Sequence, residues 1–275
     1  MLDVRFFSIP RFGAGSLGVT FTFFAMFSMF FLIAQYLQSV RGYTPLRAGV
    51  YTLPFAVTMI AISPRGAALA ARFEPKKVIV TGMFIMPIGL LVLSLADVDS
   101  SYLIVALGLV VLAAGAALAI PTLSTGIVLS LPLDKAGVGS AVNDTTREVG
   151  GAVGIAVVGT VLASAYRDGI KPILAQLPAE AAQVADTARD GVGALSGLVQ
   201  AAPNIPELQG RLPQLDSLLV VAKDSFVDGM QAGLRLSAAI SVVVGLIVWR
   251  WYPTGQLQPF GAMPAGMAHA GRATD

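Results

Sequence analysis

Four polar residues at 143–148 form the part of this sequence best suited to chemistry. Asn143, Asp144, Arg147 and Glu148 directly precede a run rich in glycine and alanine. On a helix, Asp144 can pair with Arg147 at i,i+3, whereas Asp144 and Glu148 at i,i+4 repel each other. Two interpretations stay open. In the first, the charges lie in water at the start of a helix and neutralise each other, and Asn143 or Asp144 offers an oxygen to the free backbone amides of the first turn. In the second, the charges pair with groups on another helix in one conformation and release them in the other.

The glycines after this cluster predict close helix packing. Gly150 and Gly154 are four residues apart, and Gly151 and Gly159 add small residues nearby. Without side chains at these positions, a second helix can approach until the two backbones nearly touch. The sequence therefore places the polar cluster where a packed helix bundle meets water.

A second charged group lies in the segment SPRGAALAARFEPKK, residues 63–77. It holds Arg65, Arg72, Lys76 and Lys77 against a single acid, Glu74. A basic excess in a short loop between membrane helices is typical of the cytoplasmic side. We therefore interpret this segment as a cytoplasmic loop.

Four further polar residues lie at the ends of apolar runs. Gln35 and Gln38 lie near the far end of the first run, and Asp228 and Arg235, seven residues apart, precede the apolar core of the last one at 236–249. Each pair has two readings. The glutamines either anchor the helix at the membrane interface or contact a substrate, and the Asp228–Arg235 pair either snorkels to the interface or faces a protein cavity.

Several kinds of chemistry are excluded by composition. The chain has no cysteine, and its one histidine, His269, lies in a tail beyond the last apolar run. Metal sites, nucleophile–histidine pairs and phosphate-binding loops are therefore not expected, and we predict neither an enzyme nor a bound cofactor. The net charge of +2 also gives no reason to expect nucleic-acid binding.

The elements that carry these residues are membrane helices. Hydrophobic residues make up 55% of the chain, charged residues 12%, and the mean hydropathy is +0.76. These values are typical of an all-α membrane protein. We expect six spans near 13–37, 48–71, 78–96, 102–131, 138–165 and 224–250.

The predicted organisation has four parts. Residues 1–166 hold five spans, 167–223 form a loop with a short surface helix near 180–199, 224–252 hold the sixth span, and 253–275 form a disordered tail.

Loop charges predict the orientation. If the N-terminus is cytoplasmic, ten basic residues lie on the cytoplasmic side and two lie in the short outer turns. The long loop 167–223 is not counted, because long loops cross the membrane largely regardless of their charge. The inner ten are Arg5, Arg11, Arg65, Arg72, Lys76, Lys77, Lys135, Arg147, Arg250 and Arg272, and the outer two are Arg41 and Arg47. We therefore expect a multi-pass protein of the cell (inner) membrane with both termini in the cytoplasm.

The run AGVGSAVNDTTREVGGAVGIAVVG, residues 136–159, resembles the penultimate helix of a known transporter family. The family is the fourteen-helix drug:proton antiporters of the major facilitator superfamily, of the EmrB/QacA type. The resemblance extends more weakly over 1–165 and 224–250, and it implies that this chain corresponds to the last six helices. By this resemblance, the 143–148 cluster is a candidate cytoplasmic gate. Residues 63–77 correspond to a conserved cytoplasmic loop of the family, although Ala71 stands where that loop has an acidic residue.

By resemblance, the chain is half of a secondary transporter that exports drugs or other hydrophobic small molecules with protons as the coupling ion. Its expected partners are the lipid bilayer, an N-terminal transporter half or a second copy, and a small hydrophobic substrate. Alternating access requires two bundles, so a single half is expected to be incomplete alone. The alternatives are a functional homodimer and a membrane scaffold or truncated remnant that transports nothing.

Overall fold

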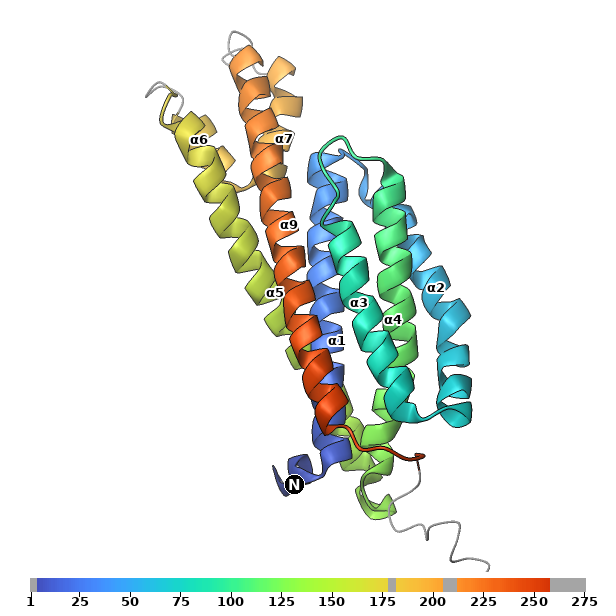
Figure 1. The fold of residues 1–275 in the computed structure, drawn as a ribbon. Helices are drawn as coiled ribbons and strands as arrows, with labels where there is room; N and C mark the ends of the chain where they lie inside the picture. The colour runs from blue at the N-terminus through green and yellow to red at the C-terminus, as the bar shows by residue number, and fades with distance from the viewer. Residues whose placement is uncertain (1–3, 178–181, 205–211, 258–275) are drawn as a thin grey trace, which may run out of the picture.

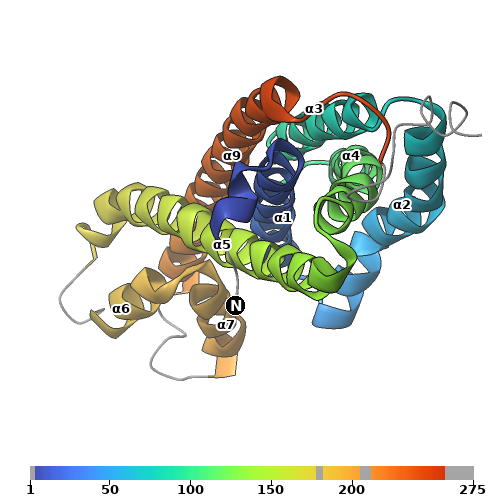
Figure 2. The ribbon, with the colours of Figure 1, turned by 90° about the horizontal axis from the view of Figure 1, so that it is seen from below.

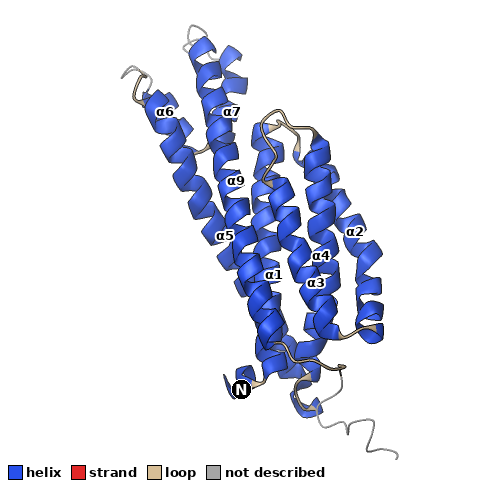
Figure 3. Ribbon diagram, viewed as in Figure 1, coloured by secondary structure: helices blue, strands red, loops and turns tan. Residues whose placement is uncertain are grey.

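The computed structural model of the 275-residue chain describes residues 4–177, 182–204 and 212–257. Six helices in it are long and apolar enough to cross a membrane, which confirms the predicted fold class (Figure 1). They are α1 (Pro10–Gln35), α2 (Pro45–Arg72), α3 (Pro75–Leu93), α4 (Tyr102–Leu129), α5 (Ala136–Leu174) and α9 (Leu212–Trp251). Among the described residues every regular element is helical (Figure 3).

Shorter helical segments connect the six. They are η1 (Val4–Ser8), the π-helical turn η2 (Tyr36–Val40), η3 (Leu133–Lys135), α6 (Ala182–Asp190), α7 (Val192–Ala201) and η5 (Ala202–Asn204).

The starts of the long helices follow from local chemistry. Pro10, Pro45 and Pro75 each occupy the first turn of a helix, where the missing backbone N–H costs nothing. Before α2, the side chain of Thr44 accepts a hydrogen bond from the Arg47 N–H at 3.3 Å, which satisfies a free amide of that turn.

The bundle is organised around α1 and α4. In the view along the helices, α3 and α9 lie on one side, α5 lies on the opposite side, and α2 lies at one end (Figure 2). Helix α1 packs against α4, α5 and α9, whereas α2 packs mainly against α4. The interior is filled by large apolar side chains that include Met29, Leu32, Met86, Leu90, Leu112 and Leu234.

Glycine allows α3 and α4 to approach closely. A Cβ added at Gly82 would lie 2.5 Å from the carbonyl oxygen of Gly115, and one added at Gly115 would lie 2.6 Å from the carbonyl oxygen of Gly82. The two backbones therefore touch with no side chain between them, as helix pairs in membranes commonly do.

Arg41 fastens two loops at one end of the bundle. Its Nη1 donates to the carbonyl oxygens of Val98 at 2.8 Å and Ser100 at 3.1 Å. Nearby, the Tyr36 hydroxyl donates to the carbonyl of Asp97 at 2.7 Å. The α1–α2 and α3–α4 connections are thus held together by hydrogen bonds to backbone carbonyls.

The last two helices are longer than the spans predicted for them. Helix α5 continues beyond residue 165 to Leu174, and α9 begins at Leu212, not near 224, so both helices enter the segment 167–223 that was predicted as a loop. Apolar length detects only the part of a helix that crosses lipid. Helix α9 also packs on α7 and helix α5 on α6, and Leu215, Leu218 and Ala222 in the first turns of α9 are buried.

The predicted surface helix at 180–199 is also corrected. Two helices, α6 and α7, take its place, and they meet at Gly191, whose φ of +135° favours glycine over any other residue. Helix α7 is not a surface helix, because Val192 and Leu195 are buried where it packs against α9 and η2.

The start of the predicted disordered tail, 253–257, contacts the bundle. The Gly255 N–H donates to Glu74 Oε1 at 3.2 Å, and Arg11 Nη2 donates to the carbonyl of Gln256 at 3.2 Å. Residues 258–275, including His269, lie outside the described residues.

Candidate functional site

The polar cluster at the start of α5 divides between two faces of the helix. Asn143 is buried, with 7% of its surface exposed, and Arg147 is half-buried. Asp144 and Glu148 are exposed on the outer side of the bundle. The four residues therefore form an inner pair, Asn143 and Arg147, and an outer pair of acids, each pair at i,i+4.

Arg147 joins α5 to two other helices. Its Nη2 donates to Ser124 Oγ of α4 at 3.2 Å, and its guanidinium carbon lies 5.2 Å from the centre of the Phe23 ring of α1. The Asp144–Arg147 pair expected from the helix spacing is present at 3.9 Å. Because Asp144 is largely exposed, this ion pair adds little stability, and the contacts with Ser124 and Phe23 fix the position of Arg147.

Two atoms of the inner pair lack partners. Asn143 Oδ1 and Arg147 Nε are buried without a hydrogen-bond partner among the described residues. Leaving such an atom unpaired costs about 1–3 kcal/mol, more when the group is charged. Both atoms can therefore gain a hydrogen bond if a neighbouring helix moves.

The glycines that follow the cluster lie against α1. A Cβ at Gly150 would overlap the carbonyl oxygen of Thr20, and one at Gly154 would lie 2.5 Å from the carbonyl oxygen of Phe24. A Cβ at Gly151 would meet the Phe27 ring at 3.0 Å. Gly159 differs, because a Cβ there would be in ordinary contact with Phe31 at 3.6 Å. Three of the four predicted packing residues are thus tightly enclosed.

The basic segment lies at the same end of the bundle as the cluster but on other helices. Arg65 donates to the carbonyl of Ala61 within α2, and the Arg72 guanidinium lies 5.7 Å from the Phe73 ring centre. At the start of α3, Lys77 pairs with Glu74 at 3.7 Å, and Lys76 is partly exposed. Among the described residues no ion pair links these cations with the acids of α5.

The remaining predicted residues are dispersed. Gln35 lines a cavity of about 340 Å³ between α1 and α5, while Gln38 is exposed and bonds to the carbonyl of its own helix at Ala34. Asp228 and Arg235 are both exposed on α9. They form no ion pair with each other, and Arg235 Nη2 instead donates to Gln231 Oε1 at 3.1 Å.

Sequence reasoning missed the partners of Arg147. Ser124 lies 23 residues before Arg147 in the chain, and Phe23 lies more than a hundred residues before it. No spacing rule links positions so far apart. It also missed Arg167 and Arg189, which line adjoining cavities at the far end of α5. Over the described residues no group of three or more His, Cys, Asp or Glu side chains is arranged to hold a metal ion.

Comparison with known proteins identifies the family. Residues 3–155, more than half of the chain, match the Major Facilitator Superfamily. The chain is 28% identical over 255 residues to the multidrug resistance protein Stp of Mycobacterium tuberculosis. The matched region covers 92% of this chain and 46% of Stp. It is 30% identical over 248 residues to the multidrug efflux pump LfrA of Mycolicibacterium smegmatis, covering 90% of this chain and 47% of LfrA.

A third relative is the tetracenomycin C resistance and export protein of Streptomyces glaucescens, 29% identical over 248 residues, with 88% of this chain and 44% of that protein covered. The chain thus spans about half the length of the curated relatives it matches. These matches confirm the predicted resemblance, and with it the assignment to a class of transporters and not of enzymes. The chain is a multi-pass membrane protein that belongs to the Major Facilitator Superfamily.

Proposed function

We propose that this chain forms one six-helix half of a secondary transporter that exports drugs or other hydrophobic small molecules in exchange for protons. The printed names of its relatives, which refer to multidrug resistance and to export, support the substrate class. Proton exchange rests on the family resemblance. A substrate site between two bundles requires a second bundle, supplied by an N-terminal half or by another copy of this chain.

The observation that carries this proposal is the open face of α5. Only 33% of the most apolar stretch of α5 is buried, and only 17% of that of α2. The corresponding buried share is 50% in α3 and in α4, and 56% in α1. The exposed side of α5 carries the small and polar residues Thr145, Glu148, Ala152, Ala156 and Thr160, together with the apolar side chains of Val149, Val153 and Ile155. Small and polar groups are typical of helix–helix contacts in membranes and gain little from contact with lipid.

The gate at the start of α5 belongs to this open face. Asp144 and Glu148 point outward from the bundle, so they can pair with cations of a second bundle, and in this conformation Arg147 contacts Ser124 of α4 and Phe23 of α1. Breaking and remaking such pairs between two conformations would open and close the pathway at this end. We assign this end to the cytoplasm of the inner membrane, because the N-terminus, the basic segment and the end of α9 lie at it together (Figure 1).

The gate is tested by Arg147→Ala in a chain complemented by its N-terminal half. We expect drug efflux to fall by at least tenfold while the amount of protein in the membrane stays unchanged. Lys135→Ala is the matched control, since Lys135 is an exposed cation just before α5 with no ion pair among the described residues. Loss of both efflux and abundance would make Arg147 a structural residue instead.

The need for a second bundle is tested in proteoliposomes with an imposed pH gradient. The purified chain alone should give no drug-dependent proton flux, and reconstitution with the N-terminal half should restore it. Robust flux from the chain alone would contradict the half-transporter proposal and favour a homodimer. Absence of flux in both preparations would favour a scaffold that transports nothing.

A further inference from the structure

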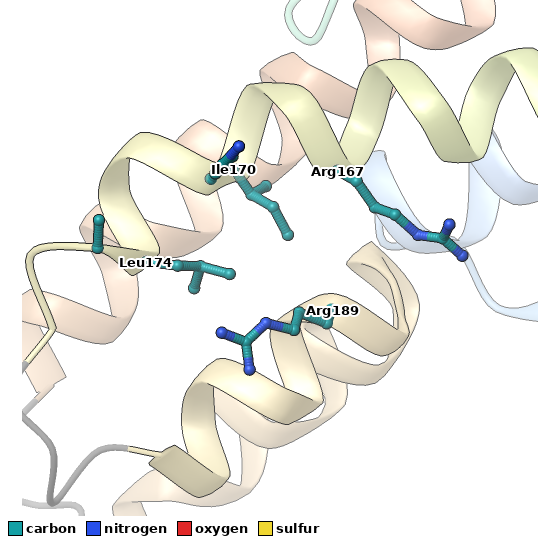
Figure 4. A pocket seen from close by; sticks show the side chains of 6 residues that line it. Arg167, Ile170, Leu174 and Arg189 are labelled. Carbon is teal, nitrogen blue, oxygen red and sulfur yellow. The ribbon is translucent and has the colours of Figure 1, made fainter.

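Cavities at the two ends of the bundle are bounded differently. At the far end of α5, a cavity of about 350 Å³ lies between α5 and α6, and its lining residues Ile170, Leu174 and Arg189 belong to regular helices (Figure 4). At the end where the N-terminus lies, a cavity of about 270 Å³ lies between α2 and α4, and two of its lining residues, Gln256 and Leu257, belong to no helix. The second cavity therefore has a wall that can move while the helices around it stay in place.

This wall is part of residues 252–257, which follow directly on α9 and which we call the strap. Figure 2 shows the strap running from the end of α9 past α3 towards α4 and α2. At its start, Tyr252 is 1% exposed, and a Cβ added at Gly126 of α4 would overlap the Tyr252 hydroxyl. At its other end, Leu257 Cδ2 would lie 3.7 Å from the same Cβ. Both ends of the strap thus contact the last turns of α4.

Hydrogen bonds tie the middle of the strap to α1 and to the α2–α3 loop. The Gly255 N–H donates to Glu74 Oε1 at 3.2 Å, and the carbonyl of Gln256 accepts a hydrogen bond from Arg11 Nη2 at 3.2 Å. Both bonds lie at exposed positions, where water competes for the same groups. They therefore open more readily than the hydrogen bonds inside a packed helix.

The backbone of the strap needs a glycine at residue 255. Gly255 has a φ of +104°, which side chains disfavour, and its N–H is the donor to Glu74. A chain end that only trails from α9 requires neither this conformation nor this bond. The strap therefore has a defined docked position, although it is not helical.

The strap lies against a weak part of α4. Pro121 lines the cavity, and it has no N–H to donate to the Ala117 carbonyl one turn earlier. Beyond this proline, α4 contacts the strap at Gly126, and Ser124 accepts the hydrogen bond from Arg147. The strap and Arg147 thus hold the same short end of α4.

We propose that the strap is a lid, which closes the cavity between α2 and α4 in this conformation and moves away to open it to the cytoplasm. When closed, the lid supports the end of α4 that carries Ser124, the partner of Arg147. When open, it exposes the cavity wall at Thr122 to water. The inference goes beyond the proposed function and is tested without transport, so its failure would leave that function untouched.

Cysteine labelling of the purified full chain tests the lid. The natural chain has no cysteine, so Thr122→Cys introduces a single thiol at a position of the cavity wall that is 2% exposed in the closed state. Its rate of reaction with a maleimide follows the fraction of time for which the lid is open. Glu74→Ala removes the acceptor of the Gly255 N–H, and we expect labelling to become about fivefold faster. Gly255→Pro removes the donor and cannot adopt the φ of +104°, so it should accelerate labelling at least as much.

Lys77→Ala is the matched control. It removes the ion pair of Glu74 at 3.7 Å but leaves Glu74 able to accept from Gly255, so the labelling rate should stay unchanged. Glu74→Ala combined with Gly255→Pro should label no faster than Gly255→Pro alone, because both changes remove the same bond. Equal acceleration by Lys77→Ala, or additive effects in the combined variant, would overturn the proposal, since a general loosening of this end would then expose Thr122. An unchanged rate, or no labelling in any variant, would also overturn it, because the strap would not be what covers the cavity.

Discussion

Replacing single glycines of α5 with alanine tests the contact between α5 and α1. At Gly150 the new Cβ would overlap the carbonyl oxygen of Thr20, and at Gly154 it would lie 2.5 Å from the carbonyl oxygen of Phe24. Both obstacles are backbone atoms of α1, which cannot rotate aside as a side chain can. Either substitution must therefore push the two helices apart or distort them.

Two opposing contributions set the size of the effect. Alanine is favoured over glycine within a helix by about 1 kcal/mol, which stabilises every such variant. Overpacking a close contact costs about 1–3 kcal/mol, and backbone overlap lies at the upper end of that range. We therefore expect Gly150→Ala and Gly154→Ala to lower the free energy of unfolding by about 1–2 kcal/mol.

The same helix provides two matched controls. A Cβ at Gly137 meets nothing within 4 Å, and one at Gly159 meets Phe31 at 3.6 Å, so alanine at either position should leave stability unchanged or raised. The four variants can be ranked by thermal unfolding in detergent, followed by the fluorescence of Trp249 and Trp251, the two tryptophans of the chain. If Gly150→Ala were as stable as Gly159→Ala, the packing of α5 on α1 described above would be wrong.

Two further predictions concern orientation and one end of the bundle. Because the natural chain has no cysteine, single variants can be labelled in intact cells: Gln183→Cys should react with a membrane-impermeant maleimide and Lys135→Cys should not, and the opposite pattern would reverse the assigned orientation. The buried hydroxyl of Tyr252 has no hydrogen-bond partner among the described residues, and a Cβ added at Gly126 would overlap it. Gly126→Ala should therefore lower the melting temperature in the natural chain but not in a Tyr252→Phe background, and equal losses in both would exclude this contact.

The six spans could be predicted because their signal is local. Each is a long apolar run whose ends carry charges, prolines or aromatic residues, so its length alone decides the assignment. The contact of Gly150 and Gly154 with a neighbouring helix was also readable, because a four-residue spacing places both on one face. The sequence did not say that the neighbour would be α1.

Features that depend on distant residues could not be predicted. The extensions of α5 to Leu174 and of α9 back to Leu212 accompany contacts with other elements, since α5 packs on α6 and α9 packs on α7. Likewise, Arg147 contacts Ser124 and Phe23 only because α4 and α1 converge beside the start of α5. Such contacts follow from the tertiary arrangement and leave no periodic pattern in the sequence.

Helix α5 has small residues on two opposite faces, and only the face with Gly150 and Gly154 is covered, by α1. Successive residues on a helix are about 100° apart, so Ala152 lies about 200° from Gly150, on the side away from α1. Ala152 is exposed there, in the same stripe as Ala156 and Glu148. A side chain that protrudes from this stripe meets lipid in the single bundle but would collide with a second bundle packed against it.

Ala152→Trp therefore separates the two situations. Thermal stability of the isolated chain should be unchanged, because the new ring points into detergent or lipid, whereas efflux by the chain complemented with its N-terminal half should be lost. Ile88→Trp is the control, since Ile88 is 53% exposed and belongs to α3, which lies on the opposite side of the bundle from α5 (Figure 2), and the substitution should leave efflux intact. Full efflux with Ala152→Trp would mean that no helix packs on this face during transport, and the small residues of α5 would then need another explanation.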